Sequence, residues 1–143
     1  MARFVDLVAV EGPDKGMRYT VEQGTYRVLA RSSDERASTL QMTSDGDRAL
    51  DKEQETLVDE VFKGRASGGT RTAAKKRGPD IVLRDQSVSR THALVFVEKA
   101  SASVVDLMST NGTKLNGSLV KDVDIVAGDV IHIGKTKLKV EDG

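Results

Sequence analysis

The sequence contains no cysteine, few aromatic residues and no net charge, and each absence narrows what the chain can do. Without cysteine, disulfide frameworks, thiolate zinc sites and cysteine nucleophiles are all excluded. Aromatic residues make up only 3% of the chain, which leaves little to stack against nucleic-acid bases. The formal net charge is +0 at pH 7, so any recognition by charge must be local.

Long hydrophobic runs are also missing. No stretch is long enough to cross a bilayer, and the first residues lead directly into alternating apolar and polar positions instead of the apolar run of a signal peptide. We therefore expect a cytoplasmic protein that does not bind membranes. The length of 143 residues fits one domain, and 38% hydrophobic with 31% charged residues indicates a folded domain plus a segment that adds little to the core.

Short segments of strand-forming residues lie at both ends of the chain, divided by clusters of Gly, Asn, Asp and Ser. They are residues 4–10, 17–21, 26–30, 81–83, 93–97, 104–107, 114–115, 129–133 and 137–140. Many short strands with frequent turns predict a β-sandwich or barrel. The first three, separated by tight turns, predict an antiparallel meander.

The strand pattern is absent between residues 32 and 79. Acidic residues dominate 34–60, and Leu50, Leu57, Val58, Val61 and Phe62 recur there at helical spacing. This pattern predicts an amphipathic helix over about 47–62 whose apolar stripe packs against the sandwich. Candidate N-caps are Ser44, Asp45 and Asp47. The Gly-rich basic stretch that follows predicts a flexible linker over about 64–78.

Two polar loops between apolar strands carry the candidate chemistry. The first is 88–92, Val-Ser-Arg-Thr-His, and the second is 106–113, followed by Asn116 and Gly117. They supply hydroxyl, amide and guanidinium groups, and Arg31 adds a further guanidinium. Neutral donors beside arginine suit an anion, most naturally the phosphate of a phosphorylated side chain.

These motifs resemble the forkhead-associated (FHA) domain family. Ser89–His92 is similar to the family's Ser-x-x-His motif, and Ser109–Thr113 with Asn116–Gly117 is similar to its second phosphopeptide loop. Residues 11–16 and 28–31 resemble the first strands and the Gly-Arg motif, and residues 127–134 resemble the closing turn and strand. The resemblance covers residues 4–31 and 80–143. It implies one discontinuous domain, 1–31 with 80–143, interrupted by an insertion over 32–79.

The resemblance implies an all-β fold, a two-sheet antiparallel β-sandwich of about 11 strands. It also implies a role for each motif residue. Arg31 would contact the phosphate or the peptide backbone, Ser89 would donate its hydroxyl to the phosphate, and Arg90 would lie beside the peptide. The residues expected to hold the peptide backbone are Thr110 and Asn111, and those expected to support the loops are His92, Gly112 and Asn116.

The function implied is non-catalytic recognition of phosphothreonine peptides in signalling by a Ser/Thr protein kinase, in a bacterium. The partner would be a phosphothreonine-containing protein, the kinase or its substrate, and no cofactor, metal or nucleic acid is expected. The sequence departs from the family's pattern around the Gly-Arg motif. Ala30 replaces the usual Gly, and a second Gly-Arg pair, Gly64-Arg65, competes with Arg31 for the motif. Arg31 is preferred because a strand precedes it.

Other functions stay open. The fold could serve as a scaffold that binds partners without phosphate, or be regulated by its own insertion, whose phosphorylatable residues are Thr39, Thr43, Thr56, Thr70 and Thr72. A hydrolase built on Ser89 and His92 is disfavoured, because the sequence has no Gly-x-Ser-x-Gly elbow and no evident carboxylate to orient the histidine. His92 and His132 alone make a poor metal site.

Overall fold

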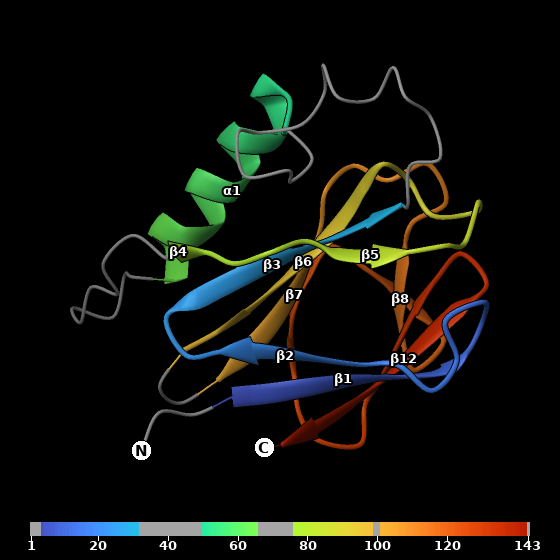
Figure 1. Ribbon diagram of the computed structural model, residues 1–143. Coiled ribbons are helices and arrows are strands. Elements are labelled where there is room, and N and C mark those ends of the chain that lie inside the picture. The colour runs from blue at the N-terminus through green and yellow to red at the C-terminus, as the bar shows by residue number, and fades with distance from the viewer. Residues whose placement is uncertain (1–3, 32–49, 66–75, 99–100, 143) are drawn as a thin grey trace.

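The computed structural model describes residues 4–31, 50–65, 76–98 and 101–142, which form two packed β-sheets with one helix on the outside (Figure 1). The first sheet, called sheet A, has the order β2-β1-β12-β11-β8-β9, and the second, sheet B, has the order β10-β7-β6-β3-β4 with β5 also on β3. The predicted all-β sandwich is confirmed.

The strand bounds follow the predicted segments closely. Sheet A consists of β1 (Phe4–Glu11), β2 (Arg18–Glu22), β8 (Thr113–Leu115), β9 (Ser118–Val120), β11 (Val130–Ile133) and β12 (Thr136–Asp142). Sheet B consists of β3 (Thr25–Arg31), β4 (Lys76–Arg77), β5 (Ile81–Leu83), β6 (Thr91–Val97), β7 (Ala102–Asp106) and β10 (Asp122–Ile125). The sequence pattern missed β4, β9 and β10, which are only 2, 3 and 4 residues long.

The predicted meander is wrong at its third strand. β1 and β2 pair as an antiparallel hairpin, but the chain then changes sheets and β3 pairs with β6. The reason is burial on both faces: Val28, Leu29 and Ala30 are all fully buried, so β3 needs a sheet that is covered on both sides. β2 has exposed residues and occupies an edge of sheet A instead.

β3 also makes the sandwich partly parallel, since β4 and β5 both pair with it in parallel. A parallel pairing requires a crossover connection between the two strands. The predicted insertion lies between β3 and β5, so in this fold it acts as that crossover.

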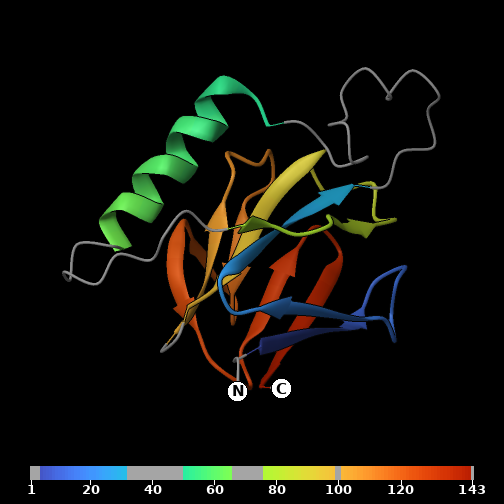
Figure 2. The same ribbon diagram turned by 60° about the vertical axis from the view of Figure 1, so that its left-hand side comes forward.

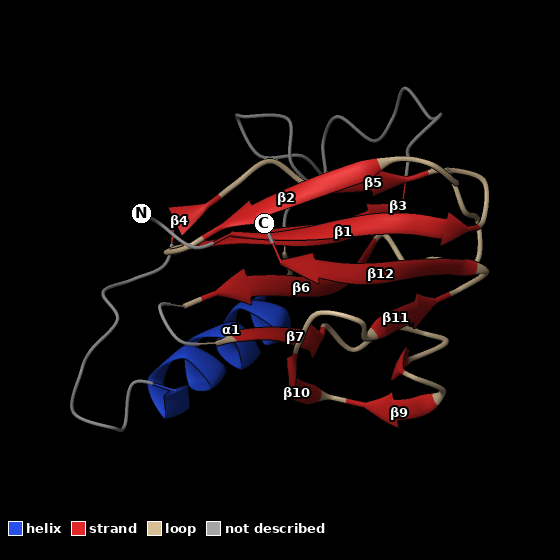
Figure 3. Cartoon of the chain, turned by 90° about the horizontal axis from the view of Figure 1, so that it is seen from below, coloured by secondary structure: helices blue, strands red, loops and turns tan. Residues whose placement is uncertain are grey.

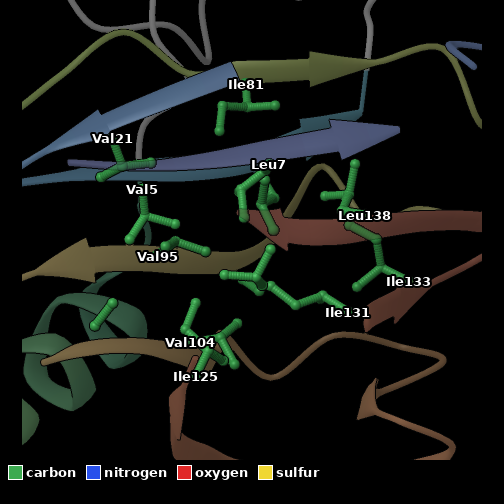
Figure 4. Packing of buried hydrophobic residues seen from close by; sticks show 14 of the residues in the cluster. Val5, Leu7, Val21, Ile81, Val95, Val104, Ile125, Ile131, Ile133 and Leu138 are labelled. Atoms are coloured by element: carbon green, nitrogen blue, oxygen red, sulfur yellow. The ribbon is translucent and has the colours of Figure 1, made fainter. Parts of the chain in front are cut away.

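The core between the sheets is apolar. Figure 4 shows Val5, Leu7 and Leu138 of sheet A facing Val95 and Val104 of sheet B, with Ile131 and Ile133 filling the space toward one end. All of these side chains are at most 1% exposed. Burial of this kind contributes roughly 1.5–3 kcal/mol for each large side chain.

A second apolar layer lies outside sheet B, beneath helix α1 (Lys52–Arg65), which runs along β6 and β7 in Figures 2 and 3. Val58 of α1 is 6% exposed and packs in a cluster with Val28, Leu94 and Phe96. Leu50, Leu57 and Val61 also pack there, which confirms the predicted stripe at these positions. Phe62 has its side chain outside the described residues.

The helix begins later than predicted. Asp51 Oδ1 accepts a hydrogen bond from the Gln54 N–H at 2.8 Å, and Gln54 Oε1 accepts one from the Asp51 N–H at 3.0 Å. This reciprocal capping box starts the helix at Lys52. The expected caps, Ser44, Asp45 and Asp47, lie outside the described residues. The predicted linker over 64–78 is also wrong at its ends, because Arg65 closes α1 and Lys76–Arg77 form β4.

Candidate functional site

Four segments meet at one end of the sandwich and enclose a hollow of about 390 Å³. They are the end of β3, the beginning of α1, the loop 84–90 between β5 and β6, and the loop 107–112 between β7 and β8. All five residues predicted to bind a phosphopeptide line this hollow: Arg31, Ser89, Arg90, Thr110 and Asn111. Residues far apart in the sequence are thus brought to one surface.

Arg31 reaches the hollow because it ends β3. Its backbone N–H donates to the carbonyl oxygen of Arg90 at 3.3 Å, which joins the two arginine positions. The alternative, Arg65, ends α1, whereas it is the beginning of α1, at Asp51 and Gln54, that borders the hollow. The geometry therefore favours Arg31 as the motif arginine.

Ala30 fits the position where the family usually has glycine. It lies within β3, paired with Val82 on one side and Thr91 on the other. Its methyl group is fully buried in the apolar cluster under α1. The side chain thus contributes to the packing of the helix while the strand conformation is kept.

His92 links the two loops from beneath. Its Nδ1 accepts a hydrogen bond from the Ser89 N–H at 3.0 Å, and its Nε2 lies 2.8 Å from the carbonyl oxygen of Gly112, to which it donates. The ring is therefore neutral, with its hydrogen on Nε2. Burial lowers the pKa of His92, and the bond to Gly112, which raises it, offsets this only in part.

The loops also contact each other directly. The Thr110 N–H donates to Ser89 Oγ at 3.0 Å, and Asn111 Nδ2 donates to the carbonyl oxygen of Ser87 at 3.0 Å. Because Ser89 Oγ is the acceptor in the first bond, its own hydrogen can be donated to a ligand. Thr110 and Asn111 thus hold the loops together as well as lining the hollow.

Asp106 shapes the second loop. Its carboxylate accepts hydrogen bonds from the Ser109 N–H at 3.2 Å and from the Thr113 hydroxyl at 2.7 Å. Gly112 closes the loop with a φ of 81°, and a Cβ there would lie 2.6 Å from Leu119 Cδ1. The loop therefore favours glycine for its backbone conformation, whereas the exposed Leu119 side chain could move to make room for a Cβ.

Asn116, expected to support the binding loops, lies elsewhere. It sits in the β8–β9 turn at a φ of 51°, donates to Asp129 Oδ1 at 3.0 Å and accepts from the Val130 N–H at 2.9 Å. Asn116 thus fixes this hairpin against the start of β11.

Sequence reasoning missed Asp85. This carboxylate is 2% exposed and accepts hydrogen bonds from the Ser87 and Lys135 N–H groups and the Thr136 hydroxyl, at 2.8, 2.7 and 2.9 Å. Burial raises the pKa of Asp85, but these bonds outweigh it and leave the pKa below its ordinary value. The sequence feature that could have revealed it is Asp85-Gln86-Ser87, a pattern typical of an Asx turn.

Gln54 was missed as well. It is 7% exposed, and its Nε2 donates to Thr91 Oγ1 at 2.8 Å and to the carbonyl oxygen of Leu107 at 2.9 Å. Its Oε1 accepts from the Thr91 hydroxyl at 3.1 Å. Helix α1 is therefore hydrogen-bonded to Thr91, which directly follows the first loop, and to Leu107, which begins the second. The sequence feature that could have revealed it is its position, four residues from both Leu50 and Val58, which places a polar side chain on the apolar face of the helix.

Within the described part of the chain, no group of three or more His, Cys, Asp or Glu side chains could hold a metal ion. The helix described there is also too short and too polar to cross a bilayer.

Replacing Gln54 by alanine should destabilise the protein by about 1–3 kcal/mol, because the Thr91 hydroxyl and the Leu107 carbonyl lose their buried partner. Urea unfolding measures the change. Glu60→Ala, at an exposed position of the same helix, is the matched control. Equal stability of the two variants would show that the Gln54 bonds do not hold the helix in place.

Acid should weaken the fold through His92. Since its pKa is below the ordinary value of 6.5, the unfolded chain binds the proton more readily. This contribution to stability is complete above about pH 6.5 and is lost as pH falls through the folded pKa, with a slope of up to about 1.4 kcal/mol per pH unit. Urea unfolding between pH 7.5 and 5 measures this fall in the free energy of unfolding. The control variant His132→Gln, which keeps His92, should lose the same stability on acidification. An NMR titration giving a His92 pKa of 6.5 or above would contradict the expectation.

Comparison with known proteins supports the two loops around the hollow, but the matched segment begins at the Gly64-Arg65 pair and does not include Arg31. The FHA domain model matches residues 64–134, a segment that holds both loops around the hollow. Glycogen accumulation regulator GarA of Mycolicibacterium smegmatis is 39% identical over 69 residues, which are 48% of this chain and 44% of GarA. This chain thus spans less than half the length of that relative.

Solved structures show the same fold over nearly the whole chain. An FHA domain solved in work on phosphothreonine-dependent FHA interactions has a TM-score of 0.57 at 22% identity, covering 96% of this chain and 95% of its own. The FHA domain of the CT664 protein from Chlamydia trachomatis has a TM-score of 0.59 at 21% identity, covering 99% and 98%. The fold of the chain is thus that of FHA domains, and the match over residues 64–134 assigns this part of the chain to the forkhead-associated (FHA) domain family.

Proposed function

We propose that this chain binds phosphothreonine-containing peptides in the hollow between the two loops, as a non-catalytic reader of Ser/Thr-kinase signalling. The observation that carries the proposal is the convergence of Arg31, Ser89, Arg90, Thr110 and Asn111 on one surface. A phosphorylated residue brings about −1.5 to −2 charges and three acceptor oxygens, which suit two guanidinium groups and a hydroxyl donor.

Each residue has a role that fits its place. Arg31 and Arg90, joined through their backbones, neutralise the phosphate, and Ser89 donates its hydroxyl hydrogen to it. Thr110 and Asn111, fixed by their bonds to the first loop, contact the peptide backbone. Because these bonds exist without ligand, little conformational entropy is lost when a peptide binds.

The arrangement argues against a Ser-His hydrolase. A catalytic histidine needs a ring nitrogen close to the serine hydroxyl to take its proton. Here Nδ1 of His92 accepts the Ser89 backbone N–H, and Nε2 is occupied by the Gly112 carbonyl. The imidazole is thus committed to holding the loops.

The proposed partners are a Ser/Thr kinase or its phosphorylated substrates, and the proposed location is the cytoplasm of a bacterium. The bacterial relative GarA is named as a regulator, which supports a regulatory role. The similarity to an FHA domain solved in work on phosphothreonine-dependent interactions supports the ligand class.

Regulation by the insertion remains a narrower hypothesis. Of its five threonines, Thr56 lies on α1, and its hydroxyl donates to the Lys52 carbonyl oxygen at 3.0 Å. Presenting Thr56 to the hollow of its own chain would require α1 to unwind and break the Gln54 bonds. Thr39, Thr43, Thr70 and Thr72 lie outside the described residues.

Arg31→Ala and Ser89→Ala should each weaken phosphopeptide binding, because each removes a contact to the charged phosphate worth about 1.5–3 kcal/mol, or about 10- to 150-fold in affinity. Fluorescence anisotropy with degenerate peptide libraries containing phosphothreonine, phosphoserine or threonine measures this. The wild type should prefer the phosphothreonine library.

Arg18→Ala is the matched control, since Arg18 lies on the edge strand β2 and pairs with Asp6 and Glu141. It should bind like the wild type. Equal affinity of the wild type for phosphorylated and plain libraries, or unchanged affinity in both site variants, would refute the proposal.

A further inference from the structure

The hollow proposed to hold the phosphate has one negatively charged group in its wall. Of the described residues that line it, Arg31 and Arg90 are cations and Asp51 is the sole carboxylate. A carboxylate on the wall of a hollow of this size lies within about 10 Å of a group bound inside, the distance over which exposed charges still act at 0.1 M salt. The charge of Asp51 therefore opposes the binding of a phosphate.

Asp51 belongs to the predicted insertion and lies immediately before α1. Its carbonyl oxygen accepts the first hydrogen bond of the helix, from the Glu55 N–H at 2.9 Å, and its carboxylate accepts one from the Gln54 N–H at 2.8 Å. Asp51 is thus the N-cap of α1. The element that brings the carboxylate to the hollow is the inserted helix and not a strand of the sandwich.

The carboxylate is held in place by the capping box. Gln54 is 7% exposed and bonds the helix to Thr91 and Leu107, which adjoin the two loops. Because Asp51 and Gln54 bond each other in both directions, Asp51 can leave the hollow only if these bonds break. A ligand thus meets a fixed negative charge there.

The helix itself offsets this charge only in part. The start of a helix carries about +0.5 elementary charge, half of what a carboxylate carries with the opposite sign. The other acidic residues of the first turn, Glu53 and Glu55, do not line the hollow. Asp51 is therefore the residue that gives the start of α1 its negative charge on the side of the site.

Building on the proposed function, we propose that Asp51 is a further residue of the phosphopeptide site, which sets its affinity by repelling the phosphate. The two residues of the capping box then act in opposite directions. Gln54 supports binding, because its buried bonds hold both loops, whereas the charge of Asp51 weakens binding. A purely structural role for Asp51 predicts that its replacement weakens binding, so the sign of the effect separates the two roles.

The test removes the charge of Asp51 and keeps the cap. Asparagine and serine begin a helix about as well as aspartate, so Asp51→Asn and Asp51→Ser should unfold in urea like the wild type. Fluorescence anisotropy with a phosphothreonine peptide of uncharged flanks measures binding. Each variant should bind this peptide about two- to fivefold more tightly at about 0.1 M salt, the size that interactions between exposed charges reach.

Salt and a matched variant distinguish repulsion from a change of shape. The gain should almost disappear at about 1 M salt, where the screening length falls to about 3 Å. Asp59→Asn removes an exposed carboxylate eight residues further along α1, about 12 Å away along the helix axis. Because Asp59 does not line the hollow, this control should bind the phosphopeptide like the wild type.

Three outcomes would overturn the inference. They are unchanged or weaker binding in both Asp51 variants, a gain that is equal at the two salt concentrations, and a gain of the same size in Asp59→Asn. The unphosphorylated twin of the peptide reports separately on the proposed function. If the wild type prefers the phosphorylated peptide and the gain is absent, only the present inference fails. If neither the wild type nor the Asp51 variants prefer it, both fail.

Discussion

The site depends on one buried imidazole. His92 accepts a hydrogen bond from Ser89 in one loop and donates one to Gly112 in the other, so its two ring nitrogens set the spacing between the loops. Burial keeps the ring neutral, which this pattern of one acceptor and one donor requires. The N–H of Thr110 also donates to the hydroxyl oxygen of Ser89, which joins the loops a second time. A ligand would therefore find its donors already placed.

Helix α1 supports the same two loops from outside sheet B. It covers the outer face of sheet B, so β6 is buried along its whole length. Gln54 bonds this helix to Thr91, which directly precedes His92, and to Leu107, at the start of the second loop. A segment that interrupts the family's motif order thus supports the two loops proposed to bind the ligand. It also places a carboxylate, Asp51, on one wall of the hollow.

Much of this could be predicted from the sequence because it is local. Ser89–His92 and Ser109–Thr113 are compact motifs, and the strands on each side alternate or are continuously apolar. The sandwich was therefore predicted correctly, and the five candidate residues lie around one hollow. What could not be predicted depends on distant partners. Nothing near β3 shows that it joins β6 and not β2, since that choice is set by the helix that covers Val28 and Ala30. The bonds of Gln54 and Asp85 likewise connect segments remote in sequence, and the capping pair Asp51–Gln54 was passed over for polar residues further upstream.

The most direct test of the account is an NMR titration of the backbone amides with a phosphothreonine peptide and its unphosphorylated twin. The phosphorylated peptide should shift the amides of Arg31, Ser89, Arg90, Thr110 and Asn111 most, and leave those of the β1–β2 hairpin unchanged. The unphosphorylated peptide should shift none of them at the same concentration. Equal shifts with both peptides, or shifts centred on the outer surface of α1 or the β2 edge, would contradict a phosphate site held between the two loops.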